Sequence, residues 1–122
     1  MNKLNFDEVL IKISKDIINA KNRIYATHLI KTEEDFNLPI VYINALKSSK
    51  CKNKKRVIFG DKELFNYFNN NEKYFKNHFS NKIYFRMLLI DDKLYFKYQD
   101  NFYMTKEKDI ICLFEGYFSY IN

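Results

Sequence analysis

The chain has 122 residues, with 12 Phe and 10 Tyr but only 2 Gly and 1 Pro, and this composition suits one domain over residues 1–122 with a hydrophobic core of its own. Its longest uncharged apolar runs, 87–90 and 110–114, are far shorter than the about 20 residues that span a bilayer, which excludes a membrane-spanning protein. Charged residues interrupt every apolar run near the start, so we expect no signal peptide. The two distant thiols, Cys51 and Cys112, suit a reducing, cytoplasmic setting.

The sequence predicts neither a metal site nor a cofactor. The two His and the two Cys lie far apart along the chain and offer no metal-ligand spacing. Gly60 and Gly116 are 56 residues apart, which excludes a phosphate-binding loop and a dinucleotide-binding fingerprint.

In chain order, the first predicted element is a helix over 6–22, in which apolar residues recur at three- and four-residue steps. A short strand over 23–28 follows. Pro39 predicts the start of a second helix, because its fixed φ and missing N–H suit a first helical turn. A buried strand over 56–59 then ends at Gly60.

A third helix is predicted after strand 56–59, with Asp61 as its N-terminal cap. His78 is assigned to the end of a helix in the next stretch, where the helix dipole favours an imidazolium.

The last third of the chain predicts mainly strands. Segments 82–90 and 93–98 form a late β-hairpin, joined by an acidic turn of Asp residues that tolerate a left-handed backbone. Segment 102–104 predicts a further strand, and 110–120 fits either a closing helix or an edge strand. This order of elements predicts an α/β domain with a mixed sheet flanked by helices.

The formal net charge of +6 lies entirely in one segment, 47–56, which holds six cations and no acid. Removing these 6 from the 21 basic residues leaves 15 against 15 acidic ones. Because a focused basic patch attracts phosphates, this segment is a candidate nucleic-acid-binding site. Its candidate residues are Lys50, Lys52, Lys54, Lys55 and Arg56. The alternative is a solvated loop, since no aromatic residue interleaves the lysines to stack on bases.

Residues 84–91 contain a second pattern that carries chemistry. Tyr84, Arg86 and Asp91 have the spacing of a His-x-Lys-x(4)-Asp motif, and helices and strands precede them in a matching order. In this respect the chain resembles a single phospholipase-D-like domain with a degenerate catalytic motif. The resemblance implies a layered α/β domain, and it implies a homodimer, because members of the family with a single motif commonly pair across a two-fold axis.

The departure from the family motif bears on chemistry. The family's nucleophile is the His, and Tyr84 stands in its place here; a phenol with an ordinary pKa near 10 is a poor substitute. Arg86 can still hold a phosphate through its two-pronged guanidinium. We therefore expect a non-catalytic module that recognises a phosphate-bearing ligand, nucleic acid or partner protein. The candidate ligand-binding residues are Arg86, Tyr84, Asp91 and His28.

Alternatives remain open at this point. His28 follows the first predicted strand, where ligands gather in α/β sheets, although it also fits as a plain strand end, and Asp61 fits as a plain helix cap. An active phosphodiesterase or nuclease would use Tyr84 or His28. A small phage- or plasmid-type inhibitor protein is a third hypothesis.

Overall fold

The computed structural model describes residues 2–28, 40–51, 54–68 and 74–121. Within them, strands form a seven-stranded mixed sheet with the order β1-β7-β6-β5-β2-β3-β4. The strands are β1 (Asn2–Leu4), β2 (Ile24–His28), β3 (Lys55–Phe59), β4 (Lys76–Phe79), β5 (Arg86–Ile90), β6 (Lys93–Tyr98) and β7 (Asn101–Thr105). The predicted α/β class with a mixed sheet and a late hairpin is confirmed.

Parallel and antiparallel pairing meet at β2. On one side β2, β3 and β4 are parallel, with Ala26 opposite Val57. On the other side β2 pairs antiparallel with β5, and the meander β5-β6-β7 continues antiparallel to the edge strand β1. The carboxyl ends of β2 and β3 therefore lie at the same end of the sheet as the start of β5.

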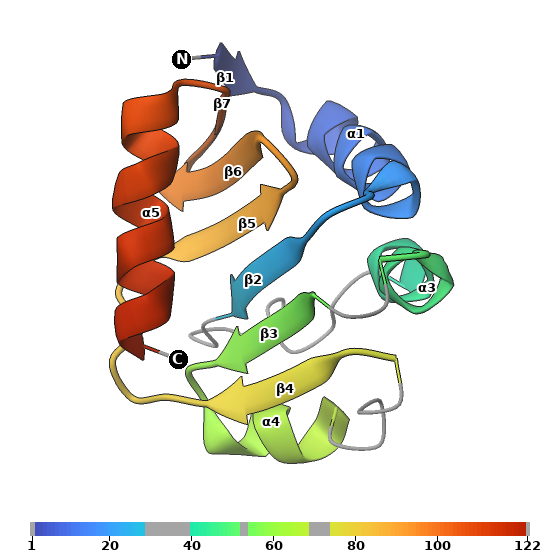
Figure 1. Ribbon diagram of the computed structural model, residues 1–122, viewed down its shortest axis with the longest axis vertical. Helices are drawn as coiled ribbons and strands as arrows, with labels where there is room; N and C mark the ends of the chain where they lie inside the picture. The colour runs from blue at the N-terminus through green and yellow to red at the C-terminus, as the bar shows by residue number, and fades with distance from the viewer. Residues whose placement is uncertain (1, 29–39, 52–53, 69–73, 122) are drawn as a thin grey trace.

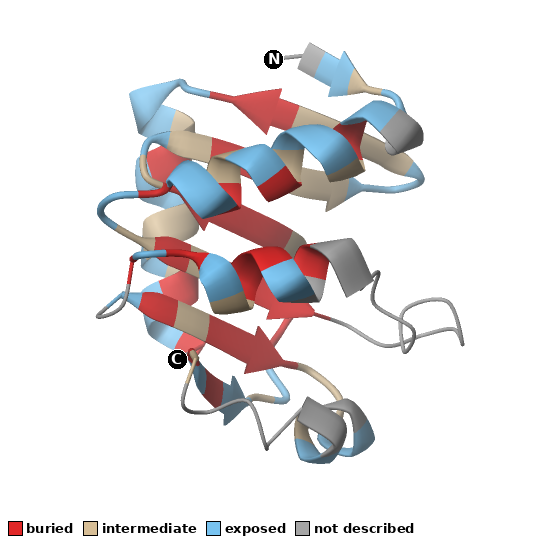
Figure 2. Ribbon diagram, turned by 90° about the vertical axis from the view of Figure 1, so that its right-hand side faces the viewer, coloured by how far each residue is buried: buried red, intermediate tan, exposed pale blue. Residues whose placement is uncertain are grey.

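Helices cover both faces of the sheet (Figure 1). The helices are α1 (Phe6–Asn19), α3 (Ile40–Ser48), α4 (Lys62–Phe68) and α5 (Lys108–Ile121). Figure 1 shows α1 and α3 on one face and α5 on the other, while α4 lies beside β4. In Figure 2 the buried residues of α1 and α3 face the sheet and the exposed ones face outward.

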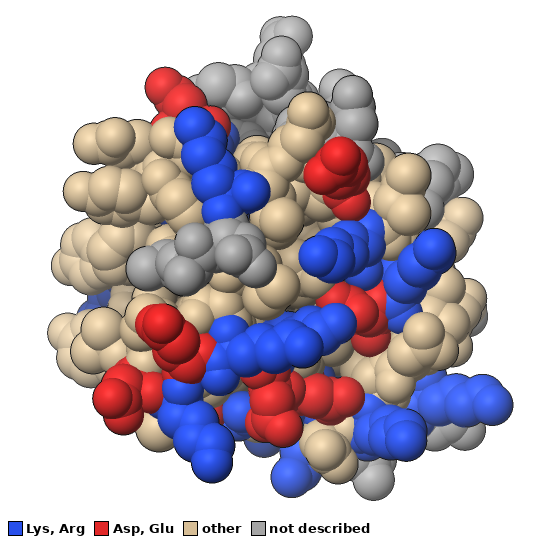
Figure 3. Space-filling model, turned by 90° about the horizontal axis from the view of Figure 1, so that it is seen from above, with Lys and Arg blue, Asp and Glu red and all other residues tan. Residues whose placement is uncertain are grey.

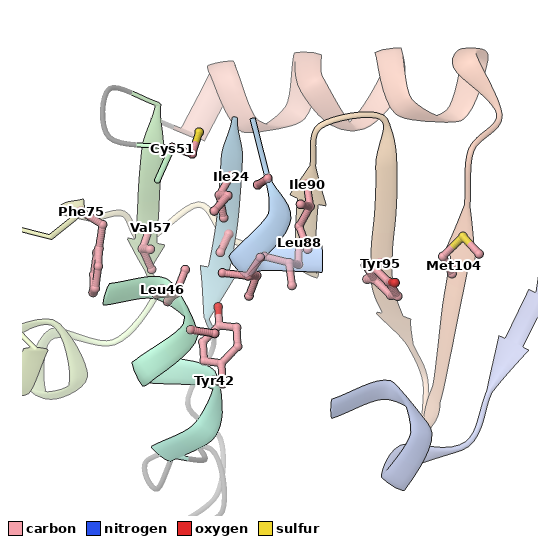
Figure 4. Close-up of a cluster of buried hydrophobic side chains, with 14 of the residues drawn as sticks. Ile24, Tyr42, Leu46, Cys51, Val57, Phe75, Leu88, Ile90, Tyr95 and Met104 are labelled. Carbon is pink, nitrogen blue, oxygen red and sulfur yellow. The ribbon is translucent and has the colours of Figure 1, made fainter. Parts of the chain in front are cut away.

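Two hydrophobic clusters lie on the two faces because side chains alternate along each strand. Under α1 and α3, Leu46 lies in one cluster with Ile24, Val57 and Leu88 (Figure 4). Under α5, buried Phe118 packs in a cluster with the intervening strand residues, such as Leu89. The alternation places Arg86, two residues before Leu88, on the α1/α3 face.

Helix α1 ends earlier than the predicted 6–22. The carboxylate of Asp91, in the turn between β5 and β6, accepts hydrogen bonds from the backbone N–H groups of Lys21 (3.1 Å), Asn22 (2.7 Å) and Arg23 (3.1 Å). These groups therefore bond to the carboxylate and not to carbonyls one helical turn earlier. The long-range contact fixes the entry into β2 in a way that local periodicity cannot reveal.

Three further differences from the sequence predictions stand out. His78 lies in β4, not at the end of a helix, because β4 pairs in parallel with β3 and places His78 opposite Ile58. The ambiguous segment 110–120 forms helix α5, which buries Ile111, Phe118 and Ile121. Strand β1 was not predicted from its three residues; it forms by pairing with β7. The predicted helix start at Pro39 lies outside the described residues.

Candidate functional site

The candidate site lies where β2 ends and β5 begins, and Thr27 shapes it. The Thr27 hydroxyl donates to the carbonyl oxygen of Phe85 (2.7 Å) and accepts from the N–H of Met87 (2.9 Å). The β2–β5 pairing ends at Ala26 and Leu88. Beyond that pair, the Thr27 side chain makes the hydrogen bonds to β5 in place of the backbone. The Thr27 hydroxyl thus bridges the end of β2 and the start of β5.

His28, the last residue of β2, is almost fully buried, with 5% of its surface exposed. Its Nε2 lies 2.9 Å from the hydroxyl oxygen of Tyr42 on α3, and the two rings meet edge to face. Burial, with a smaller contribution from the positive charge of Arg86, lowers the pKa of His28 to about 3. The imidazole is therefore neutral at pH 7.

Tyr42 is the polar partner that the sequence reasoning missed. Burial raises its pKa far above the usual value near 10, although the Arg86 charge acts in the opposite direction, so the phenol stays protonated. Figure 4 shows its hydroxyl pointing from α3 toward the sheet. Tyr42 lies in an apolar helix, where Phe or Leu would pack equally well. The presence of a hydroxyl at this position was the one sequence signal that it has a polar role.

These groups form one end of a pocket of about 300 Å³ between α1, α3 and the strands β5–β7. The wall from α1 is apolar and consists of Val9, Leu10 and Ile13. Polar side chains also line the pocket, namely Thr27, His28, Tyr42, Arg86, Lys97 and Asp100. The pocket thus offers both apolar and polar groups to a ligand.

The three residues of the degenerate motif are not gathered at one point. Tyr84 precedes β5, and 71% of its surface is exposed; its backbone N–H donates to the hydroxyl of Tyr117 on α5 (2.6 Å). Arg86 begins β5 and lines the pocket. Asp91 follows the last residue of β5, about 17 Å away along a strand that rises 3.3 Å per residue.

Asp91 instead organises the opposite end of the sheet. Its backbone is left-handed, with φ 51°, and its carboxylate binds the turn that leads into β2. Partial burial raises the carboxyl pKa, but the three backbone donors and the Arg23 charge together outweigh it, so the pKa of Asp91 is lowered overall. This pattern fits a structural carboxylate.

Asp61 also has a structural contact, at the start of α4. Its Oδ1 accepts from the N–H of Glu63 (2.8 Å), which is the geometry of a helix N-cap. The cap interpretation of Asp61 is confirmed.

The cations of segment 47–56 fall into different environments. Lys50 and Lys54 are exposed and Arg56 is half-buried, whereas Lys52 lies outside the described residues. Lys55 is 4% exposed, and its ammonium donates to two carbonyl oxygens at the end of α3, at 2.9 and 3.1 Å. Its role is thus to cap a helix, and we leave it out of the nucleic-acid-binding surface.

Strand β4 and the residues just before it add two side chains that the sequence reasoning missed, Lys76 and Tyr74. Lys76 pairs with Arg56 across the β3–β4 register, and the Lys47 ammonium lies 5.4 Å from the centre of the Tyr74 ring. We call this set the basic strip. It consists of Lys47, Lys50, Lys54, Arg56 and Lys76, around the ends of α3 and the starts of β3 and β4. Tyr74 supplies an aromatic side chain beside these cations.

Elsewhere the charges are mixed. On the face seen in Figure 3, basic and acidic side chains alternate over the coloured surface, so this face presents no field of one sign. Ion pairs also join opposite charges, such as Lys93 with Asp16 at 3.0 Å. The basic strip is therefore the more distinctive electrostatic feature.

The described residues contain no group of three or more His, Cys, Asp or Glu side chains arranged to hold a metal ion. Across the same parts of the chain, the helices all fall short of the length and apolarity needed to cross a membrane. Cys51 and Cys112 are both free thiols, the first buried and the second exposed.

Comparison with known proteins places the fold. No protein-family model matches the chain, and neither does any curated protein at the level of sequence. Several solved structures share the architecture, and two of them are described below. TrmBL2, described as an archaeal chromatin protein that shows a novel mode of DNA binding, superposes with a TM-score of 0.65 at 18% identity over 94% of this chain.

The second structure is NucT from Helicobacter pylori, with a TM-score of 0.64 and 14% identity. The match covers 98% of this chain and 92% of NucT, whereas this chain spans only 46% of TrmBL2. The likeness is one of fold. It extends over nearly the whole chain and includes the sheet that carries the pocket and the basic strip.

Proposed function

We propose that the chain is a phospholipase-D-like domain with a degenerate motif that acts as a non-catalytic nucleic-acid-binding module. The observation that carries the proposal is the shared fold with DNA-binding TrmBL2 over 94% of the chain. The basic strip gives this fold a surface for phosphates, since Lys50, Lys54 and Lys76 are exposed around one end of β3 and β4. Tyr74 beside Lys47 gives the strip a face on which a base can stack.

The absence of catalysis in this proposal rests on the geometry around β5. Tyr84 takes the place of the family nucleophile, and 71% of its surface is exposed to solvent. His28 is buried and engaged with Tyr42. Asp91 binds backbone at the other end of the strand. A chromogenic phosphodiester tests this directly: we expect no turnover above buffer, and turnover that is lost in Tyr84→Phe or His28→Ala would overturn it.

Nucleic-acid binding is tested by charge reversal with a matched control. In the strip variant Lys50, Lys54 and Lys76 become Glu, which changes the formal net charge from +6 to 0. The control variant carries the same change at Lys3, Lys106 and Lys108, which are exposed and belong to other parts of the fold.

Duplex and single-stranded DNA binding is then measured by fluorescence anisotropy over a series of salt concentrations. For the strip variant we expect the slope of log K against log salt to fall by about 2.7 for duplex DNA, which corresponds to three lost phosphate contacts. The control should keep most of the slope. Equal losses in both variants would show that only net charge matters and would refute the strip as the contact surface.

We also propose that the module forms a homodimer. Exposed apolar side chains support an interface along the start of β5 and α5, where Tyr84, Phe85, Leu113 and Tyr120 are 71%, 40%, 71% and 66% exposed. Size-exclusion chromatography with light scattering tests this, and a strict monomer at high concentration would refute it. We propose a cytoplasmic location as well, and the two free thiols, Cys51 and Cys112, support it.

A further inference from the structure

Helix α5 carries a glycine that no described contact within the chain requires. Gly116 is exposed and lies in the interior of this 14-residue helix, where Gly is the poorest helix former after Pro. Its φ is outside the left-handed region, and a Cβ at this position would meet no heavy atom within 4 Å among the described residues. Such a glycine is typical of a place where another backbone approaches closely.

Gly116 also lies at the centre of an uncharged stripe on the outward side of α5. At about 100° per residue, the other members fall within about 60° of Gly116 around the helix. The exposed residues of this stripe are Cys112, Leu113, Gly116, Ser119 and Tyr120. Between 110 and 121 the one charged residue is Glu115, which pairs with Arg23 at 3.1 Å. The outward side of α1, in contrast, carries charged residues such as Glu8 and Lys12. Depletion of charge around exposed apolar side chains is typical of the centre of a protein interface.

The charges at the two ends of the stripe indicate what covers it. Asp109 is exposed on the same side as Gly116, two turns earlier, whereas its neighbour Lys108 is turned about 80° away from Gly116. At the other end, the Lys82 ammonium lies 5.1 Å from the centre of the Tyr120 ring. An antiparallel copy of α5 brings the acid of each chain to the end where the other chain carries the cation. This self-complementarity is what a two-fold pair of identical chains requires.

The stripe is continuous with the start of β5. The Tyr117 hydroxyl accepts from the backbone N–H groups of Tyr84 (2.6 Å) and Phe85 (3.1 Å), so α5 holds this segment in place. Tyr84 and Phe85 are the exposed aromatic residues of β5 and its approach that support the proposed homodimer. Leu113 and Tyr120 extend the same exposed apolar surface along α5.

We propose that two copies of the chain pair through α5, antiparallel and crossing at Gly116 around a two-fold axis. The helix backbone of the second copy occupies the space above Gly116, and Leu113 and Tyr120 pack beside the crossing. Asp109 of each copy lies at the end of the pair where the other copy carries Lys82. This pairing rests on the proposed homodimer and specifies the surface and the orientation through which the two copies meet.

Sedimentation equilibrium on the wild type and three single variants tests the surface. Gly116→Gln adds a side chain at the crossing and should weaken the dimer at least about 10-fold. Leu113→Gln removes an apolar side chain that is 71% exposed from the stripe, and it should also weaken the dimer about 10-fold. Ile11→Gln makes the same kind of change on α1, where Ile11 is 61% exposed, and should leave the dissociation constant within about 2-fold.

The folding of these variants is checked by far-UV circular dichroism. Gly116→Gln should fold at least as well as the wild type, because Gln is the better helix former and the position is open. If it nevertheless loses its fold, the comparison of Leu113→Gln with Ile11→Gln decides.

The outcomes distinguish this pairing from the homodimer itself. A dimer of unchanged strength in Gly116→Gln and Leu113→Gln would overturn the α5 pairing and leave the homodimer standing. A wild type that stays monomeric at high concentration would overturn both. An equal loss in Ile11→Gln would show that exposed apolar surface in general drives the association, which also overturns the α5 pairing.

Disulfide trapping tests the orientation. Cys112 and Tyr120 lie four residues before and after Gly116, so each is about 6 Å from it along the helix axis. In the antiparallel crossing, Cys112 of one copy therefore lies opposite residue 120 of the other. The two Cys112 residues are about 12 Å apart along the axis, beyond the about 7 Å between Cα atoms that a disulfide can span.

Under mild oxidation, at protein concentrations above the dissociation constant, we expect no covalent dimer in the wild type and a covalent dimer in Tyr120→Cys. Cys112 is a free, exposed thiol, whereas Cys51 is buried. The matched control, Tyr120→Cys with Cys112→Ser, should stay uncrosslinked, since the two residues 120 are also about 12 Å apart. A covalent dimer through Cys112 in the wild type would indicate a parallel pair, and no covalent dimer in Tyr120→Cys would exclude the crossing at Gly116. Either result overturns the proposal.

Discussion

Two turns in the sheet share a backbone conformation and differ in what their side chains do, which makes a sharp test possible. Asp91 has φ 51° and Gln99 has φ 56°, both in the left-handed region that disfavours residues with a Cβ. Changing either residue to Gly relieves about 1–2 kcal/mol of backbone strain. Gly also gives the unfolded chain more conformational entropy, and this cancels roughly 0.5–1 kcal/mol of the stabilisation. On backbone grounds alone, both changes should stabilise the protein by about 0.5 kcal/mol.

The side chains reverse this expectation at Asp91. Its carboxylate accepts three backbone hydrogen bonds, of 3.1, 2.7 and 3.1 Å, that fix the entry into β2. Bonds to a charged group contribute about 1.5–3 kcal/mol each when buried, and solvent exposure reduces the three together to about 3 kcal/mol. After the backbone gain, Asp91→Gly should lower the free energy of unfolding by about 2 kcal/mol, whereas Gln99→Gly should raise it by about 0.5 kcal/mol.

Urea denaturation followed by circular dichroism at pH 7 measures both changes. In thermal scans they correspond to a fall of about 8 °C for Asp91→Gly and a rise of about 2 °C for Gln99→Gly. The size of the Asp91 effect also depends on pH. Because the folded-state pKa of Asp91 lies below its unfolded value of about 3.9, its contribution is fully present above about pH 4 and is lost as the pH falls through the folded-state pKa.

The gap between the wild type and Asp91→Gly should therefore narrow in acid. A stabilising Asp91→Gly, or a gap that stays constant down to pH 2.5, would show that the carboxylate does not organise this turn. Equal effects of the two Gly substitutions would lead to the same conclusion.

Three further predictions concern the interior. Lys55→Met leaves two carbonyl groups at the end of α3 without their donor, so it should lower the free energy of unfolding by about 2 kcal/mol in a urea titration. Lys54→Met, at an exposed position, is the control and should change the free energy of unfolding by less than about 0.5 kcal/mol. Tyr42→Phe leaves Nε2 of His28 unpaired and should cost about 1–2 kcal/mol; no measurable loss would mean that the hydrogen bond is not formed in solution. The pKa of His28, lowered to about 3 from its ordinary 6.5, makes the unfolded chain bind the proton first, so stability should be full above about pH 6.5 and fall toward pH 3. His28→Gln should remove that part of the pH dependence of the unfolding midpoint.

The sequence predicted the fold class because the apolar periods of its long elements are strong. The hairpin of β5 and β6 follows from two alternating runs around Asp91–Asp92, and α1 follows from its apolar stripe. The helical period of α5 was ambiguous over 110–120, because aromatic residues such as Phe114 favour strands as readily as helices.

Elements that depend on distant partners escaped prediction. Strand β4 reads Lys76-Asn77-His78-Phe79, a polar segment with no alternation of apolar residues, and it becomes a strand because β3 supplies its hydrogen bonds. Strand β1 has three residues and needs β7 in the same way.

The candidate site was predictable in part. His28 and Arg86 were selected because one ends a strand and the other carries the motif's cation, and the structure brings both to one pocket. Tyr42 and Lys97 were missed, because the contact of Tyr42 with His28 arises from helix packing and the place of Lys97 opposite Arg86 arises from strand register. Lys55 was selected for its charge, while its burial depends on which face of β3 it occupies. Whether the selected residues bind a ligand stays a prediction.

The outermost position of β1 has a consequence for how the protein is made. Its partner residues, Phe102 to Met104, are synthesised about 100 residues after it. At translation rates of 5–20 residues per second, the nascent β1 therefore waits roughly 5–20 s for the strand that completes its edge of the sheet. Until β7 is made, the backbone groups of β1 that will pair with it have no strand partner from this pairing.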